Sequence, residues 1–331
     1  MNSNLYITKS GTLSRKDNTL LFENQIIKKV IPIEGISTIY LFGETSLNTK
    51  LLNFLSQNQI IVHVFNYYGF YAGSFMPKDG YVSGKLLVNQ VEHYTNLDKR
   101  IQLASKFVEG IGQNLLYVLD HYQRHGSNLD DIRGRIKKKI NRIVRVKDIC
   151  EMLSVEGGIW NNFYSSFERI LPESFQMETR KIRPPNNPIN ALISFANSLL
   201  YTQTLSQIYQ TQLNPTIAYL HEPSEKRFSL SLDISEVFKP DMTFRLIFKL
   251  VNKNMIKILD FDKKKNYCLL NDEGRIKFLQ EFDNRLNQTK KHPKLKRKVS
   301  LKTMIKLECY KIIKHLMGEQ EYNPFDLDSY S

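Results

Sequence analysis

The sequence has few cysteines, and their spacing is unlike that of a metal knuckle or a disulfide framework. Cys150, Cys268 and Cys309 lie far apart, and none belongs to a C-x-x-C pair. Zinc knuckles and small disulfide scaffolds both require such paired spacing. We therefore expect each cysteine to be a small buried hydrophobic residue.

Long apolar runs and nucleotide-binding loops are also missing. No run approaches the roughly 20 apolar residues that span a bilayer, and the N-terminus lacks a basic stretch followed by an apolar one. We expect a cytosolic protein without a membrane partner. The sequence contains no P-loop, no strand followed by G-x-G-x-x-G, no G-x-S-x-G and no H-E-x-x-H. Nucleotide hydrolysis, dinucleotide redox chemistry and serine hydrolysis are therefore poorly supported.

Acidic residues are outnumbered by basic ones. The chain has 33 Asp and Glu against 47 Lys and Arg, a formal net charge of +14 and a pI near 9.4. Such an excess favours a polyanionic partner, either nucleic acid or an anionic membrane surface. A generically basic, solvated surface is the alternative.

The hydrophobic pattern predicts an α+β protein, with a small β-rich N-terminal domain followed by a larger all-α domain. Short strand-like runs separated by turn residues fill residues 1–88, with one helix over about 46–57. Composition changes near residue 78, so 78–95 is the expected linker and 96–331 the helical domain. Helical spacing of apolar residues marks 97–124, 129–144, 189–213, 229–251 and 300–317.

The densest basic run is 290–298, which holds six Lys and Arg residues around His292 and Pro293. Proline argues for a loop here, because it cannot continue a helix. From the sequence, a phosphate-contacting loop and a plain solvated loop are equally supported.

One histidine and two carboxylates occur within a short span. His221 follows a proline-containing segment, while Asp233 and Glu236 share one face of an otherwise apolar helix. Buried acids are costly unless they are paired or metal-bound, and histidine with carboxylates is a mixed N/O ligand set. A divalent-metal site and a structural histidine with buried ion pairs both remain open at this point.

Glu156 lies in an unusual piece of helix. It is followed by Gly157 and Gly158 and then by the only tryptophan, Trp160. Glycine costs about 1 kcal/mol in a helix interior relative to alanine. Two in a row indicate that something packs close to the backbone, although a surface glutamate at a helix break is the simpler reading.

Several blocks, in order, resemble the CRISPR-associated protein 1 family, the integrase and endonuclease of the spacer-acquisition complex. Each block alone is weak, but the ordered set covers nearly the whole chain. The blocks are 11–18 and 65–69; Glu156-Gly157 with Trp160, Asn161 and Tyr164; Arg183-Pro184-Pro185 followed by 188–195; Leu220-His221-Glu222; and 232–240.

The resemblance implies a catalytic metal site for Mg²⁺ or Mn²⁺. Its ligands fall on Glu156, His221 and Glu236, with Asp233 as a supporting acid and Tyr164 near the scissile phosphate. The chain departs from the family in two places. Ala218 replaces a common glycine, and Phe244 replaces a common acid before Arg245, which puts the role of that arginine in doubt.

The resemblance also implies the reaction and the partners. The expected activity is metal-dependent strand transfer, in which the 3′-hydroxyl of a captured double-stranded DNA fragment attacks the repeat of a CRISPR array. The expected partners are a second copy of the chain, joined through the N-terminal domains, and a smaller second CRISPR adaptation protein. A non-catalytic basic DNA-binding scaffold and an RNA nuclease are the competing interpretations. Candidate phosphate contacts near the blocks are Lys181, Arg183, Lys226 and Arg227.

Overall fold

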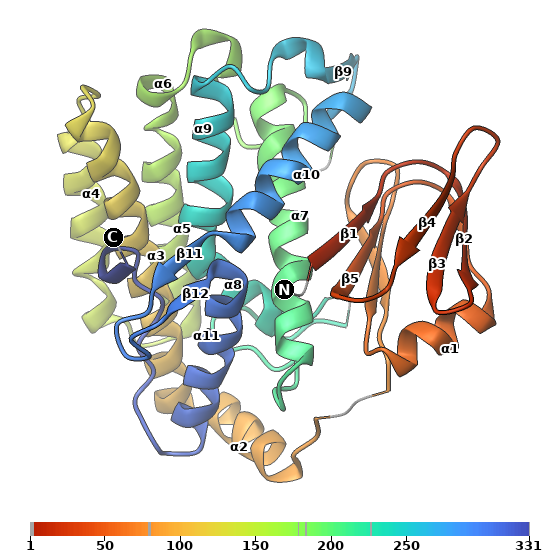
Figure 1. Ribbon diagram of the computed structural model, residues 1–331. Helices are drawn as coiled ribbons and strands as arrows, with labels where there is room; N and C mark the ends of the chain where they lie inside the picture. The colour runs from red at the N-terminus through yellow and green to blue at the C-terminus, as the bar shows by residue number, and fades with distance from the viewer. Residues whose placement is uncertain (1–2, 79–80, 178, 183, 226, 331) are drawn as a thin grey trace. The chain divides into compact units, whose positions relative to one another are not determined.

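The protein is described by a computed structural model that covers residues 3–78, 81–177, 179–182, 184–225 and 227–330 (Figure 1). The chain divides into two compact units, Met1–Gly80 and Tyr81–Ser331. The first is β-rich and the second mainly helical, as the sequence predicts. In the described part of the chain, no helix is both long enough and apolar enough to cross a membrane.

The first unit contains two four-stranded sheets and one helix. One sheet has the order β1-β5-β7-β8, in which only the β7–β8 pair is antiparallel. The other has the order β4-β3-β2-β6, with a tight turn at Asp17, whose φ of 53° is left-handed. The elements are β1 Ser3–Ile7, β2 Gly11–Lys16, β3 Thr19–Glu23, β4 Lys28–Pro32, β5 Ile36–Leu41, β6 Thr45–Ser46, α1 Thr49–Gln57, β7 Ile61–Phe65 and β8 Tyr71–Phe75.

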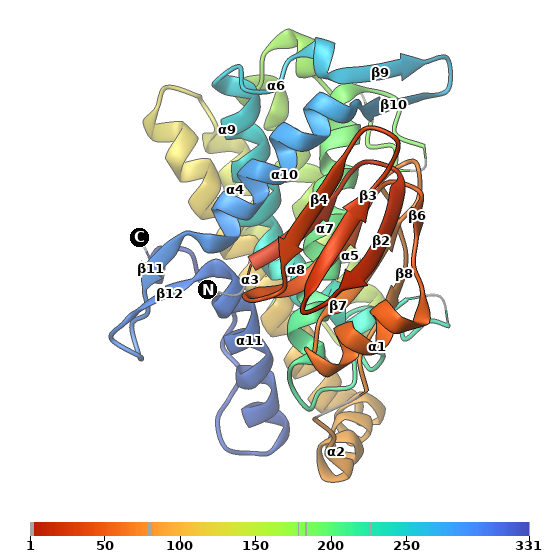
Figure 2. The same cartoon turned by 45° about the vertical axis from the view of Figure 1, so that its right-hand side comes forward.

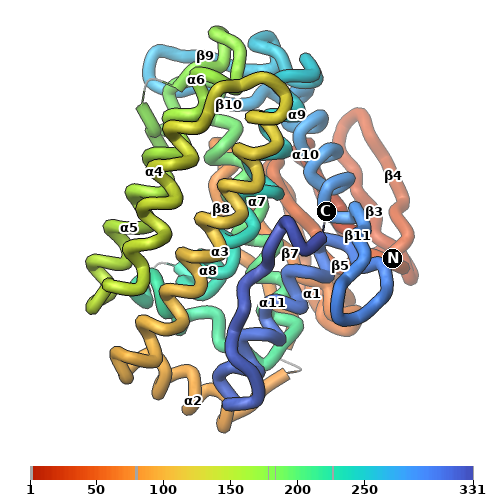
Figure 3. Tube along the Cα trace, turned by 90° about the vertical axis from the view of Figure 1, so that its left-hand side faces the viewer, coloured from red at the N-terminus to blue at the C-terminus, as the bar shows by residue number. Residues whose placement is uncertain are grey.

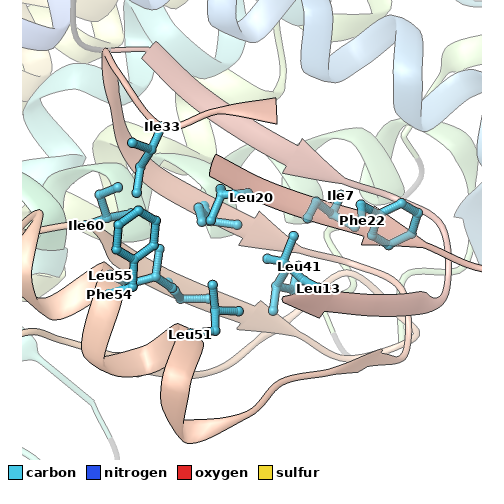
Figure 4. Close-up of a cluster of buried hydrophobic side chains, with 12 residues drawn as sticks. Ile7, Leu13, Leu20, Phe22, Ile33, Leu41, Leu51, Phe54, Leu55 and Ile60 are labelled. Atoms are coloured by element: carbon cyan, nitrogen blue, oxygen red, sulfur yellow. The ribbon is translucent and has the colours of Figure 1, made fainter. Parts of the chain in front are cut away.

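A buried hydrophobic cluster joins both sheets to α1. Figure 4 shows Leu13 and Leu20 from one sheet, Leu41 from the other and Leu51 and Leu55 from α1 in this cluster. Burial of these side chains stabilises the unit.

The second unit is a bundle of helices with two short hairpins. Figure 2 shows both hairpins at its edges, β9–β10 and β11–β12. The elements are α2 Gly84–Thr95, α3 Leu97–Arg124, α4 Asp130–Ile140, α5 Ile149–Tyr164, α6 Phe167–Ile170, α7 Pro188–Tyr209, α8 Ser229–Lys239, a π-helical segment Pro240–Arg245, α9 Leu246–Asn252, β9 Phe261–Lys264, β10 Tyr267–Leu270, α10 Asp272–Asn287, β11 Thr289–Lys291, β12 Lys298–Ser300 and α11 Leu301–Leu316.

Four sequence-based expectations need correction. The expected linker is largely helix α2, which Ser83 caps by accepting from the Leu86 N–H. The all-α expectation overlooked the two hairpins. Residues 292–297 of the basic run form the expected loop around Pro293, but the ends of the run belong to two paired strands, β11 and β12, which the sequence did not predict. Cys150 is exposed on α5, whereas Cys268 and Cys309 are buried.

Two helices position the residues singled out above. Asp148 starts α5 by accepting from the Glu151 N–H, and α5 lies beside α4 (Figure 3). Helix α8 continues through the π-helical segment into α9, so the helix predicted over 229–251 is confirmed. Pro240 has no N–H to donate, which explains the change of helical hydrogen bonding there.

Candidate functional site

Three segments of the second unit supply the candidate site. Helix α5 carries Glu156, α8 carries Asp233 and Glu236, and the segment before α8 carries His221. The charges of Glu236 and His221 both act on the pKa of Glu156, which means that the three groups lie near one another. The structure therefore brings together residues from positions 156, 221 and 236.

Asp233 organises the segment that carries His221. Its carboxylate is fully buried and accepts four hydrogen bonds. Oδ2 accepts from the backbone N–H groups of Tyr219 and Leu220 at 2.8 and 2.9 Å. Oδ1 accepts from the His221 backbone N–H at 3.0 Å and lies 2.8 Å from the His221 Nδ1. With all its capacity engaged inside the protein, Asp233 is a positioning residue.

The contact with Asp233 fixes the orientation of the His221 ring. A carboxylate at Nδ1 holds the proton there, so Nε2 is the nitrogen that presents a lone pair. Burial lowers the pKa of His221, but the hydrogen bond and charge of Asp233 and the charges of Glu236 and Glu156 raise it above its usual 6.5. Histidine ligands of metals are held by carboxylates in this way.

Glu156 has an environment that disfavours its charge. Burial and the nearby Glu236 carboxylate raise the pKa of Glu156 to about 7, against the opposing effects of His221, Lys239 and the Trp160 hydrogen bond. Trp160, one turn along α5, donates from Nε1 to Oε1 at 2.6 Å. Two carboxylates close together inside the protein create a place where a cation would be stabilised.

Glu236 has one satisfied oxygen and one unsatisfied oxygen. Oε1 accepts from the Lys239 ammonium, which also lies over the Trp160 ring, 5.7 Å from its centroid. Oε2 is buried and has no hydrogen-bond partner among the described residues. Because an unpaired carboxylate oxygen in the interior is costly, this atom points to a missing cation or donor.

The donor set suits a divalent cation that prefers oxygen and imidazole ligands. In the described residues, however, no three His, Cys, Asp or Glu side chains close around a common point. Two of the candidate carboxylates instead hold Lys239 and Trp160. The residues fit such an ion by their chemistry, and binding would require the carboxylates to exchange these partners.

Tyr164 is linked to an arginine that the sequence analysis missed. Burial raises the pKa of Tyr164 to about 12, and its hydroxyl is hydrogen-bonded to Arg180 and close to Glu236. The Arg180 guanidinium also donates to the Lys181 carbonyl at 2.7 Å, Asn190 Oδ1 at 3.0 Å and Ser194 Oγ at 3.3 Å. All these acceptors are neutral, so a largely buried positive charge lies near the site with no carboxylate of the described residues in contact.

The four predicted phosphate contacts have different outcomes. Lys181 and Arg227 are exposed. Arg183 and Lys226 lie outside the described residues. Arg180 is the first cation of the basic stretch that includes Lys181 and Arg183. The sequence alone could not show which of these side chains is directed into the protein.

The structure also resolves the doubt about Arg245. The carboxylate missing at Phe244 is supplied by Asp241, whose Oδ1 accepts from Arg245 at 3.0 Å and from Arg285. Phe244 is buried instead in an aromatic cluster with Trp160 and Tyr164. The ion pair is therefore kept, with the acid one helical turn earlier in the chain.

The two glycines after Glu156 differ in their surroundings. A Cβ on Gly158 would come within 2.8 Å of the Lys139 side chain of α4, so the expected close approach to the backbone is found there. A Cβ on Gly157 would meet nothing within 4 Å. The helix therefore has open space next to Glu156.

Known proteins resemble this chain over nearly its whole length. Residues 5–284 match the family described as CRISPR associated protein Cas1. A CRISPR-associated endonuclease Cas1 from Thermodesulfovibrio yellowstonii is 51% identical over 97% of this chain and 98% of its own length. A solved Cas1 protein from Thermotoga maritima is 38% identical, with a TM-score of 0.87 over 98% of this chain and 100% of its own. A casposase bound to an integration product, 21% identical with a TM-score of 0.87 over 99% and 94% of the two chains, shares the fold.

Proposed function

Because this chain belongs to the Cas1 family of CRISPR-associated proteins, we propose that it is an integrase that joins captured DNA fragments to a CRISPR repeat. Its relatives carry the name endonuclease, and endonuclease and strand-transfer activities attack the same phosphodiester. The observation that carries the proposal is the Glu156, His221 and Glu236 group, in which Oε2 of Glu236 is buried and finds no partner in the described part of the chain.

A metal would be held by Glu156, the Nε2 of His221 and Glu236. When bound, Mg²⁺ or Mn²⁺ would polarise the scissile phosphodiester and stabilise charge on the leaving oxygen. Asp233 keeps the His221 ring in the orientation and protonation state that a ligand needs. These residues contribute preorganisation, because Asp233 has already fixed the backbone from Tyr219 to His221.

The bonds exchanged define the reaction as transesterification. The 3′-hydroxyl of the captured fragment attacks the phosphorus in the repeat, a new phosphodiester forms, and the original bond to the leaving oxygen breaks. The proton lost by the hydroxyl balances the one gained by the leaving oxygen. If water attacks instead, the same exchange is hydrolysis and gives nuclease activity.

Arg180 and Tyr164 are the chain's best-placed donors to the substrate phosphate. The guanidinium carries positive charge beside Tyr164, and the raised pKa of Tyr164 keeps its hydroxyl protonated as a donor. Arg180→Lys should slow strand transfer while leaving DNA affinity nearly unchanged, because a lysine cannot reproduce the planar set of donors. Equal rates for Arg180→Lys and the wild type would contradict this role.

The partners follow from the same proposal. They are double-stranded DNA, a second copy of this chain joined through the N-terminal units, and a smaller second CRISPR adaptation protein, Cas2. The net charge of +14 supports DNA. A steep loss of affinity with added salt would support a phosphate-dominated interface, and a salt-insensitive affinity would contradict it.

The test separates an enzyme from a DNA-binding scaffold. Glu156→Ala and His221→Ala should abolish metal-dependent joining of a labelled fragment and leave DNA binding largely intact. Glu151→Ala is the matched control, because Glu151 lies on the same helix near its N-terminus. Full joining activity in either site variant would overturn the assignment. Cleavage of RNA in place of DNA would favour the RNA-nuclease interpretation.

A further inference from the structure

The β11–β12 hairpin carries a concentration of positive charge that the candidate metal site does not use. Between positions 284 and 307 the chain has nine Lys and Arg residues and no Asp or Glu. Figure 2 shows the loop that joins the two strands projecting away from α11. Five of the cations are exposed on the strands and the loop: Lys291, Lys294, Lys296, Arg297 and Lys298.

The pairing of the two strands places like charges opposite each other. Lys291 on β11 is the register partner of Lys298 on β12. Directly opposed like charges destabilise a two-stranded sheet. A local arrangement that weakens the folded hairpin, with no compensating ion pair among the described residues, is expected at a functional site.

The loop is held in shape by its own backbone and by His292. The His292 Nδ1 accepts from the backbone N–H groups of Lys294 and Leu295, and its backbone pairs with Lys296 and Arg297. The cationic side chains therefore project from a preorganised turn. Binding through them costs less conformational entropy than binding through a disordered basic tail.

The base of the hairpin continues the charge toward the helix that holds Glu236. Lys290 is half-buried beside Arg245 and Arg285, which share the single carboxylate of Asp241. Three cations around one acid leave a net positive charge. Asp241 lies five residues after Glu236, about 7.5 Å along the axis at the α-helical rise of 1.5 Å per residue.

We propose that the β11–β12 hairpin is an arm that binds the phosphate backbone of duplex DNA outside the candidate metal site. The choice of DNA as the polyanion rests on the proposed function. The exposed surface of the loop is mainly lysine and arginine, with Leu295 as its one large exposed apolar side chain. Such a surface suits sequence-independent phosphate contacts better than a protein interface, whose centre is rich in aromatic residues. The arm holds and orients the duplex and touches no reacting atom.

The experiment compares two triple variants, each of which loses three positive charges, one at the β11–β12 hairpin and one at the β9–β10 hairpin. The arm variant is Lys294→Gln, Lys296→Gln and Arg297→Gln, which leaves His292 and the strands intact. The control is Lys253→Gln, Lys263→Gln and Lys265→Gln, in and beside the β9–β10 hairpin. Affinity for a labelled duplex of mixed sequence is measured for both and for the wild type at several salt concentrations.

The arm variant should have a salt slope smaller by about 2 to 3 and an affinity weaker by on the order of a hundredfold at 0.15 M salt, because each phosphate contact contributes about 0.9 to the slope. The control should differ little from the wild type. Equal affinities and slopes for the two variants would overturn the proposal, as would unchanged DNA binding with loss of binding to a partner protein. Circular dichroism and the unfolding midpoint verify that both variants fold.

Strand joining is followed on the same samples at saturating DNA. If the wild type joins strands and the arm variant binds DNA as tightly as the control variant, only the proposal for the arm is refuted. If the wild type joins no strands, but the arm variant still binds DNA more weakly than the wild type, only the proposed function is refuted.

Discussion

The substitution Asp233→Asn tests the residue on which the His221 segment depends. An amide keeps one acceptor oxygen and places an NH₂ donor where the other carboxylate oxygen was. Each carboxylate oxygen accepts two of the four hydrogen bonds, so either orientation of the amide loses two of them. At least one buried backbone N–H is then left facing a donor.

The expected loss of stability follows from that count. A buried donor without a partner costs about 1–3 kcal/mol, and hydrogen bonds to a charged group contribute about 1.5–3 kcal/mol each. We predict that Asp233→Asn lowers the free energy of unfolding by about 2–6 kcal/mol, measured by urea denaturation. Asp262→Asn, on the exposed face of β9, is the control and should change it by less than about 0.5 kcal/mol.

A second readout separates this role from general destabilisation. The pKa of His221 is raised against the effect of burial chiefly by Asp233, so the Asn variant should have a lower pKa at His221. NMR titration of the histidine ring measures the change in the folded protein. An unfolding free energy within about 0.5 kcal/mol of the wild type, together with an unchanged His221 pKa, would show that Asp233 does not hold the His221 segment.

Three further predictions concern the helices around the site. Gly157→Ala should raise the free energy of unfolding by about 0.5–1 kcal/mol, because alanine favours a helix over glycine. Gly112→Ala should lower it by about 1–3 kcal/mol, because the new Cβ would meet Ile140 at 2.7 Å. Thermal melts that rank the two variants in the opposite order would contradict this. The pKa of Glu156 is about 7 in the folded protein and 4.5 ordinarily. The protonated form therefore favours folding, and this contribution to stability is complete below pH 4.5 and is lost as the pH rises through 7. In metal-free buffer, Glu156→Gln should therefore gain stability relative to the wild type from pH 5 to pH 8, and parallel pH profiles would contradict the shift. Asp241→Asn should cost about 3–5 kcal/mol, because it leaves two guanidinium groups without their carboxylate, and a loss below about 1 kcal/mol in urea denaturation would show that the pairs are not needed.

Long, strongly periodic elements could be read from the sequence. The helix predicted over 97–124 has those bounds in the structure, because thirteen of its residues are buried along one continuous helix. Helix α10 was missed although Phe278, Phe282 and Leu286 follow a helical spacing. Its charged residues and Gly274 conceal that pattern in a single sequence. Hairpins with strands of three or four residues carry too little periodicity to be predicted.

The candidate site shows a similar division. The order of the blocks was enough to single out Glu156, His221 and Glu236 before any geometry was known. The partners of these residues could not be predicted, because they depend on packing between segments distant in the chain. Arg180 reaches Tyr164 from the segment before α7, and no pattern in the sequence indicates that contact.

Strand transfer by the wild-type protein is measured with its proposed smaller partner present. Labelled duplex fragments that end in a 3′-hydroxyl or in a 3′-dideoxy nucleotide are incubated with a supercoiled plasmid that carries a repeat, with Mg²⁺ or with chelator. We expect a labelled plasmid joint only with the 3′-hydroxyl and Mg²⁺. A joint that forms from the dideoxy end or in chelator, or no joint under any of these conditions, would contradict it.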